Sequence, residues 1–426
     1  MIACRALGAR AAEGRVARAF SSVFKQSKTL QRSAALEAAA SVELLESSPF
    51  VGPHLVVNSH TEWDPLEEVI VGRVDGATIP EWHVAGKAVW PPKWWDMYKT
   101  QAGQPFPLEL MHNAAEELDN FADVLTQEGV VVQRPEIRTG DFDRRVSTPD
   151  FESQCQLYAT MPRDVLTVVG NEVIEAPMAW RSRFFEYRPY RSLLKDYFRR
   201  GAKWTAAPKP EMGERLYMPE EDWEEGEGKF VTTEYEPVFD AADFTRMGRD
   251  IFCTRSHVTN EFGIEWMRRH LGDEYRIHVL DFQDPNAMHI DADFIPLGAG
   301  KVMVNPKRTC VTGEHKTFFT YDGQEKEYRL PEMFRGWDVF IAPTPVLPES
   351  HTLFFTTPWI ASCNVLLLDE RRVVVEASEE PTIRAFESWG FETVKVPFRH
   401  VMPFGGSFHC TTCDIRRRGT LESYFD

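Results

Sequence analysis

The chain has 426 residues, of which 43% are hydrophobic and 12% aromatic, and its formal net charge is -17. This composition excludes a disordered, collagen-like or coiled-coil protein, and the length is enough for one large core or two smaller ones. So acidic a surface repels phosphate backbones, which makes nucleic acid a poor candidate partner and small cationic substrates a better one. No apolar run of about 18 residues occurs, so we expect no transmembrane helix.

The N-terminal segment differs from the rest of the chain. Residues 1–32 hold seven Lys and Arg residues against one acid, Glu13, and are rich in Ala and Ser. Residues 18–22 (RAFSS) resemble a mitochondrial processing site. We therefore predict a mitochondrial transit peptide and disordered leader over residues 1–45, with a plastid address or a merely basic tail as alternatives. The seven cysteines are too few for a disulfide framework, which fits a reducing compartment.

The predicted elements follow in chain order after residue 60. The first are a strand at 67–73, a helix at 108–128 ended by Gly129, and a strand at 130–133. Next come a hairpin at 164–177 turning at Gly170-Asn171, a helix at 181–200 and a strand near Trp204. Then we expect a strand from Asp250, a helix at 259–271 and a strand at 275–282. The last are a hairpin at 294–305 with a strand at 337–343, and strands at 364–369, 372–377 and 392–398 around a helix opened by Ser378 and ended by Gly390.

These elements form five groups with the order strand, strand, helix, strand in whole or in part. Repetition of this kind is typical of closed, radially repeated structures rather than of a chain of independent domains. An ordinary α/β domain is the alternative interpretation. Either way, the sequence predicts an α/β fold and one domain over residues 60–426.

Cys410 is the first candidate for chemistry. It follows two glycines in the segment 405–413 (GGSFHCTTC), directly after the last predicted strand. A thiol in such a loop is a plausible nucleophile if a nearby cation lowers its pKa. Because Cys413 lies three residues on, half a zinc site or a redox pair is an alternative, as is a buried structural thiol. A structural zinc site needs a second pair of ligands at the usual spacing, and the sequence holds no such pair.

Other candidate groups are a histidine, two acids and an arginine. His289 precedes a predicted strand in a polar segment and could act as general acid and base. Asp164 and Asp240 stand among apolar residues, where a carboxylate usually pairs with a cation, although a capping role is the simpler explanation for either. Arg308 could clamp a carboxylate. No phosphate-binding glycine motif precedes a helix, so we expect no nucleotide cofactor, and no metal.

Long blocks of the chain resemble the glycine amidinotransferases of the pentein, or guanidino-modifying, superfamily. They span nearly everything after residue 60: 62–73, 148–153, 161–164, 170–187, 229–244, 263–270, 284–291 and 405–426. Long blocks such as the last two are highly specific. The resemblance implies a five-bladed, pseudo-five-fold α/β propeller of ββαβ modules. It also implies transfer of the amidino group of arginine to glycine, which gives guanidinoacetate, a creatine precursor, and ornithine.

The resemblance assigns a role to each candidate. Cys410 would attack the guanidino carbon, His289 would move protons, and Asp240 would hold His289. Asp164 and Asp291 would bind the substrate guanidinium. The remaining substrate contacts are expected from Arg308, Thr356, Thr357, Asn286 and Met288. The resemblance further suggests a homodimer with peripheral association to the mitochondrial inner membrane, on the intermembrane side, and no cofactor.

Three departures from the family pattern affect substrate contacts rather than thiol chemistry. The insertion 312–333 is long and follows Arg308 closely. Thr356 and Thr357 stand where the family tends to have serines, and the spacing from them to Asn364 is one residue longer than the family pattern. Asn286 and Met288 favour glycine as acceptor. The alternatives are an arginine deiminase-like hydrolase, an amidinotransferase with another acceptor, and a catalytically silent scaffold.

Overall fold

The structure is a computed structural model, and it describes residues 55–426 with short gaps. The gaps are 227–228, 281, 311–317, 320–327, 330, 349–350, 356 and 426. The predicted transit peptide, Thr356 and most of the insertion at 312–333 therefore lie outside the described residues. None of the helices in the described part of the chain is both long enough and apolar enough to cross a membrane.

Within the described residues, five three-stranded sheets share one pattern. In each, a central strand pairs antiparallel with one neighbour and parallel with the other. Their strands are β21-β1-β2 (Thr412–Arg417, Leu66–Val71, Val131–Gln133), β5-β6-β7 (Leu166–Val169, Glu172–Glu175, Lys203–Ala206), β8-β9-β10 (Phe244–Met247, Asp250–Cys253, Arg276–Val279), β12-β13-β17 (Phe294–Gly298, Lys301–Val304, Asp338–Ile341) and β18-β19-β20 (Leu366–Leu367, Arg372–Glu376, Glu392–Val396).

A parallel pair needs a crossover connection, and in four of these sheets the described crossover contains a helix. The four are α4 (Leu108–Gln127), α6 (Arg191–Arg199), α7 (Glu261–Leu271) and α9 (Glu380–Ser388). In α4 the buried residues recur at helical spacing and include Leu118, Phe121 and Leu125. The described part of the β13–β17 crossover holds a 3-10 helix, Glu332–Phe334, and the hairpin β15–β16 (Phe318–Phe319, Tyr328–Arg329). The strand, strand, helix, strand order is thus confirmed along the chain for three groups, those of α6, α7 and α9.

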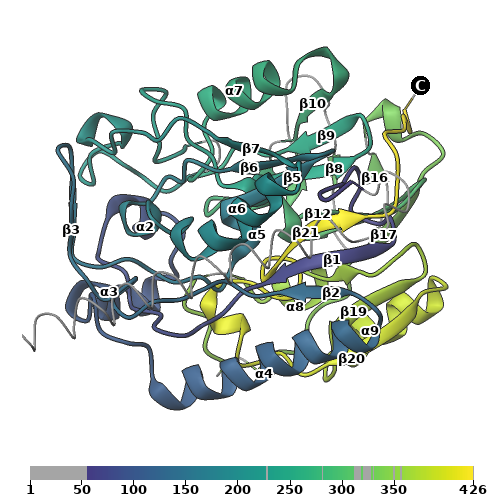
Figure 1. The fold of residues 1–426 in the computed structure, drawn as a ribbon, viewed down its shortest axis with the longest axis horizontal. Helices are drawn as coiled ribbons and strands as arrows, with labels where there is room; N and C mark the ends of the chain where they lie inside the picture. Colours follow the sequence, from purple (N-terminus) through teal and green to yellow (C-terminus); the bar gives the residue numbers. More distant parts are fainter. Residues whose placement is uncertain are drawn as a thin grey trace, which may run out of the picture. The chain divides into compact units, whose positions relative to one another are not determined.

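The first sheet joins the two ends of the described chain. Strand β21 pairs with β1 along Leu66–Val71, and the two lie side by side in Figure 1. Strands β1 and β2 were predicted from the sequence, whereas β21, which completes the first group, was not. A closed five-bladed arrangement of the sheets stays a prediction.

Two local predictions were wrong in detail. The helix predicted at 181–200 is an α-helix only over Arg191–Arg199, and 3-10 turns precede it. Pro189 explains the break, because proline lacks the amide hydrogen that a helix interior requires. Asp164 does not begin a strand but lies in a one-turn helix, α5 (Pro162–Val165), immediately before β5. The hairpin turn at Gly170 is confirmed, with a φ of 57° that favours glycine.

The remaining elements are short. They are α2 (Val84–Lys87), α3 (Trp95–Thr100), α8 (Ile360–Cys363), and the two-stranded pairs β3–β4 (Val146–Ser147, Glu152–Ser153) and β11–β14 (Phe282–Gln283, Thr309–Cys310).

Candidate active site

The candidate residues lie in short segments that each precede the first strand of a sheet. Asp164 lies in α5 before β5, and Asp240 caps a 3-10 turn (Ala241–Asp243) before β8. His289 caps another (Ile290–Ala292) before β12, Asn364 caps α8 before β18, and Cys410 directly precedes β21. One equivalent position in each of the five groups therefore carries a polar side chain.

These five segments contact one another in sequence. Helix α5 packs on the turn that Asp240 caps, this turn packs on the turn that His289 caps, and the latter packs on α8. From α8, the Asn364 Nδ2 donates to Cys410 Sγ over 3.1 Å. The Arg163 backbone N–H of α5 donates to the Cys410 carbonyl over 3.4 Å, which closes the ring. The ring places groups that are up to 246 residues apart in the chain around one point.

Cys410 is buried, and two side chains fix its sulfur. Its Sγ lies 3.3 Å from Asp291 Oδ2, and Asn364 contacts it from the other side. The Asn364 Oδ1 also accepts from the backbone N–H groups of Ser407 and Cys410, at 2.9 and 3.0 Å. Burial raises the pKa of the Cys410 thiol well above its usual value, and the carboxylates of Asp291 and Asp164 raise it further. The thiol is therefore protonated in this state of the site.

His289 lies between two carboxylates. Its Nε2 is 3.1 Å from Asp240 Oδ2, its Nδ1 is 3.6 Å from Asp164 Oδ1, and its backbone N–H donates to Asp243 Oδ1 over 3.0 Å. Burial lowers the pKa of His289, but the charges of Asp164, Asp240 and Asp243 outweigh burial and raise it to about 10. His289 is thus a cation at neutral pH, held by acids as its predicted role requires.

Arg183 was missed by the sequence analysis. Its buried guanidinium contacts Asp164 Oδ2 at 2.9 Å, Asp240 Oδ2 at 3.3 Å and Glu186 Oε2 at 2.8 Å. It therefore fixes both carboxylates that face His289. Burial raises the pKa of Glu186 to about 7, so this third partner of Arg183 is only partly charged near neutral pH.

Three buried side chains form a compact donor cluster. One donor atom each from Asp164, His289 and Cys410 can be chosen so that all lie within 4.8 Å of one another, which would suit a metal ion. A metal would have to displace protons from both His289 and Cys410. The same proximity lets a substrate atom touch all three groups at once.

The predicted substrate contacts line a neighbouring cavity. Asn286, Met288, Arg308 and Thr357 border a cavity of about 400 Å³, whereas Cys410 and His289 do not line it. Met288 and Phe355, which line it, pack in the same apolar cluster as Cys410. The structure thus assembles the site residues in two adjoining groups.

The polar groups of this cavity already have protein partners. The Arg308 guanidinium contacts Asp284 at 2.9 Å and Asp293 at 2.7 Å. The Asn286 amide donates to the Ala88 carbonyl over 2.8 Å. An incoming carboxylate would therefore compete with Asp284 or Asp293 for Arg308.

The two cysteines of the C-x-x-C pair face different surroundings. Both are free thiols, and Cys413 lies in a second apolar cluster, where its Sγ contacts the Leu166 carbonyl at 3.5 Å. Burial raises the pKa of Cys413 to about 12, and it also raises that of Cys410, so the two thiols differ in their partners: Cys410 Sγ lies with Asp164 and His289, whereas Cys413 Sγ faces a backbone carbonyl. The geometry favours Cys410 as the nucleophile over a redox pair.

Comparison with known proteins gives the family, although no family model matches. Glycine amidinotransferase, mitochondrial, from Xenopus tropicalis is 53% identical over 379 residues, which cover 87% of this chain and 85% of that protein. The L-arginine:L-lysine amidinotransferase of Pseudomonas savastanoi pv. phaseolicola is 50% identical over 372 residues, 86% of this chain and 96% of that protein. A solved amidinotransferase of Microseira wollei from the saxitoxin biosynthetic pathway superposes with a TM-score of 0.76 at 46% identity, covering 87% of this chain and 99% of that one. This chain belongs to the glycine amidinotransferase family.

Proposed function

We propose that the protein transfers the amidino group of L-arginine to glycine through an amidino-cysteine at Cys410. The observation that carries the proposal is the meeting of Cys410, His289 and Asp164 within 4.8 Å, in a buried ring of loops. A guanidinium is a poor electrophile. A thiol, a proton donor and carboxylates that grip a flat cation are the groups needed to attack it without a cofactor.

The charge of the site fits a cationic substrate. Burial raises the pKa of Asp164, and the same carboxylate raises the pKa of the Cys410 thiol. A substrate guanidinium placed between Asp164 and Asp291 compensates both carboxylates, and this lowers the pKa of Cys410. Arginine therefore promotes formation of the thiolate that attacks it.

The first half-reaction releases ornithine. When arginine binds, the Cys410 thiol loses its proton to solvent, because His289 already carries one. The thiolate then bonds to the guanidino carbon, and the bond from that carbon to the side-chain nitrogen of ornithine breaks. The His289 imidazolium gives its proton to the departing nitrogen, so that ornithine leaves as a neutral amine and His289 becomes neutral. Asp240 keeps the ring oriented throughout.

The second half-reaction restores the enzyme. Glycine, after its ammonium group has lost one proton to solvent, gives a second proton to His289 as its nitrogen attacks the amidino carbon. The carbon–sulfur bond breaks, and Cys410 leaves as a thiolate. Both half-reactions use one site, so steady-state kinetics are expected to be ping-pong.

The adjoining cavity suits the amino-acid parts of the two substrates. Arg308 would bind the substrate carboxylate with Thr356 and Thr357, while Asn286 and Met288 would shape the acceptor side. The test is to incubate the protein with arginine and glycine and to measure products. We expect guanidinoacetate and ornithine in equal amounts; citrulline and ammonia would instead identify a hydrolase, and preferential amidination of lysine would identify another acceptor.

The same proposal covers the architecture and location. We infer that the five sheets are blades of a five-bladed propeller, a pentein fold, with the site at its axis, and that residues 60–426 form one catalytic domain. Relatives named mitochondrial support a transit peptide at 1–45, and we further propose a homodimer associated peripherally with the inner membrane. A fluorescent protein fused behind residues 1–45 should accumulate in mitochondria; a cytosolic signal would contradict the targeting proposal.

Gly406 offers a test of how closely the loop surrounds Cys410. An added Cβ at this position would lie 2.3 Å from Cys410 Cβ and 2.8 Å from Sγ, so Gly406→Ala must displace the thiol. We expect kcat to fall about 100-fold, because displacements near 1 Å at a reacting group cost this much. Gly213→Ala is the matched control, since its added Cβ meets nothing within 4 Å. Equal kcat values in the two variants would show that Cys410 need not sit where the loop holds it.

A further inference from the structure

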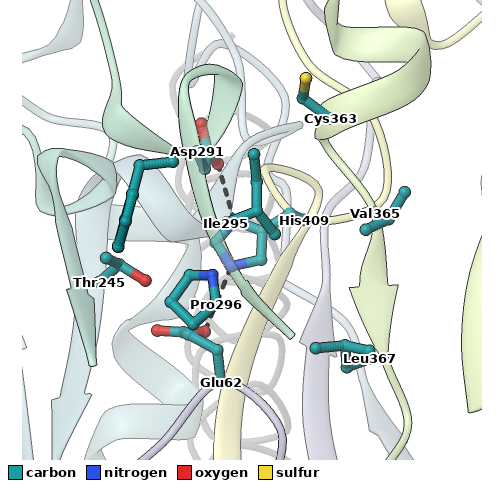
Figure 2. Close-up of a pocket in the computed structure, with 10 residues that line it drawn as sticks. Glu62, Thr245, Asp291, Ile295, Pro296, Cys363, Val365, Leu367 and His409 are labelled. Atoms are coloured by element: carbon teal, nitrogen blue, oxygen red, sulfur yellow. Dashed lines mark hydrogen bonds and ion pairs between the residues drawn. The ribbon is translucent and has the colours of Figure 1, made fainter. Parts of the chain in front are cut away.

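His409 forms a bridge next to the proposed nucleophile. Its Nδ1 lies 2.7 Å from Asp291 Oδ2 and its Nε2 lies 3.2 Å from Glu62 Oε2, so both nitrogens face carboxylates. Figure 2 shows Asp291, His409 and Glu62 in line beside a small cavity of about 10 Å³. The His409 side chain is 11% exposed, so water does little to screen these contacts.

Both nitrogens can donate only if the ring is an imidazolium. A neutral imidazole has one N–H, and its other nitrogen would direct a lone pair at a carboxylate. Burial and the nearby Arg163 lower the pKa of His409, but Asp291 and Glu62 outweigh them and raise it. For Asp291, burial alone would raise the pKa, but the contact with His409 outweighs burial and holds this pKa below its usual value.

Glu62 is itself fixed from behind. Its carboxylate accepts from Arg246 at 2.8 and 2.9 Å and from Arg163 at 3.3 Å. Asp414 holds the same two arginines, at 2.9 and 2.7 Å. His409 Nε2 is therefore held by a buried ion network, and its Nδ1 contacts Asp291.

Asp291 links this network to the reacting sulfur, because its Oδ2 contacts both His409 Nδ1 and Cys410 Sγ. Without a cation on Oδ2, the carboxylate could rotate, and its full charge would act on the sulfur. We propose that His409 is a positioning residue that orients Asp291 and compensates part of its charge, so that Asp291 can grip the substrate guanidinium while it suppresses ionisation of Cys410 less than an unpaired carboxylate would.

Two substitutions separate orientation from charge. In His409→Asn the amide nitrogen stands where Nδ1 stood, so the bond to Asp291 can persist while the charge is lost. In His409→Gln the amide nitrogen stands where Nε2 stood, so the bond to Glu62 can persist while Asp291 is released. If His409 had a purely structural role, both substitutions would lower the activity of the protein together with its thermal stability.

The first readout is the pH dependence of Cys410 alkylation by a small iodoacetamide probe, without substrate. The charged and titratable groups around His409 are Asp291, Glu62, Arg163, Cys410 and, one contact further, Arg246 and Asp414. Both variants lose the positive charge beside Asp291, so we expect both alkylation profiles to move to higher pH than that of the unsubstituted protein. Profiles that coincide with the unsubstituted one would overturn the proposal.

The second readout is turnover, and it rests on the proposed function. We expect kcat/KM for arginine to fall about 100-fold in His409→Gln and about 10-fold in His409→Asn, with KM for glycine nearly unchanged. Equal losses in the two variants would contradict the positioning role. If the unsubstituted protein transferred no amidino group, the proposed function would fail, but the alkylation profiles would still test His409.

Discussion

Replacing Cys410 with serine is expected to lower kcat for amidino transfer by at least about 10⁴-fold, because the Cys410 sulfur is the thiol that lies with Asp164, His289 and Asp291. A serine hydroxyl has a far higher pKa than a thiol and cannot ionise beside two carboxylates. Circular dichroism and the melting temperature should stay close to those of the unsubstituted protein, since oxygen replaces sulfur in a nearly unchanged volume.

Cys413→Ser is the matched control for this substitution. Cys413 lies three residues on, is equally buried, and contacts the Leu166 carbonyl, which a serine hydroxyl can also reach. We expect most of the activity to remain. Equal loss in the two variants would overturn the assignment of Cys410 as the nucleophile and would favour a role for the pair.

Asp240→Asn should weaken the proton donor. Asp240 is one of three carboxylates that hold the pKa of His289 near 10, so its neutralisation lowers that pKa. The imidazolium is present below the folded-state pKa and is lost as pH rises through it, so the alkaline limb of kcat should move to lower pH by more than about one unit. We expect kcat near pH 8, where His289 stays largely protonated, to fall about 100-fold, because the ring loses the carboxylate that orients it. The pH dependence of kcat measures this, and an unmoved alkaline limb would exclude His289 as the proton donor.

Asp243→Asn is the comparison for that variant. Asp243 accepts from the His289 backbone rather than from its ring, and an amide oxygen can still accept that bond. Asp243 raises the pKa of His289 through its charge alone, and it does so less than Asp164 or Asp240. The alkaline limb of the kcat–pH profile should therefore move less in Asp243→Asn than in Asp240→Asn.

The sequence predicted those parts of the fold that depend on local patterns. The hairpin turning at Gly170, the helix α4 and the β19–α9–β20 crossover were all found, because turn chemistry and hydrophobic periodicity act over a few residues. Strand β21 was missed because its partner β1 lies about 350 positions earlier, and a non-local pairing leaves no local signal. The predicted helix at 181–200 failed because a proline interrupts an otherwise helical pattern.

The residues of the site likewise fall into those that could be predicted from the sequence and those that could not. The resemblance named Cys410 and His289, and the structure adds their surroundings. Arg183, His409 and Asn364 were missed, because each acts through a contact with a distant segment. These contacts are Arg183 with Asp240, 57 residues away, His409 with Asp291, 118 residues away, and Asn364 with Cys410, 46 residues away. One signal was available in the sequence: a polar residue stands two to five positions before the first strand of each group. That rule selects Asn364 as well as the named residues, but it does not select Arg183.

The most direct test of the central claim is mass spectrometry of the protein after incubation with arginine alone, followed by peptide mapping. The account predicts an adduct of about 42 Da, the mass added when an amidino group replaces the thiol hydrogen, on the peptide that contains Cys410. Glycine should then remove the adduct and release guanidinoacetate. An unmodified Cys410 peptide in protein that is releasing ornithine would contradict the amidino-cysteine and with it the whole mechanism.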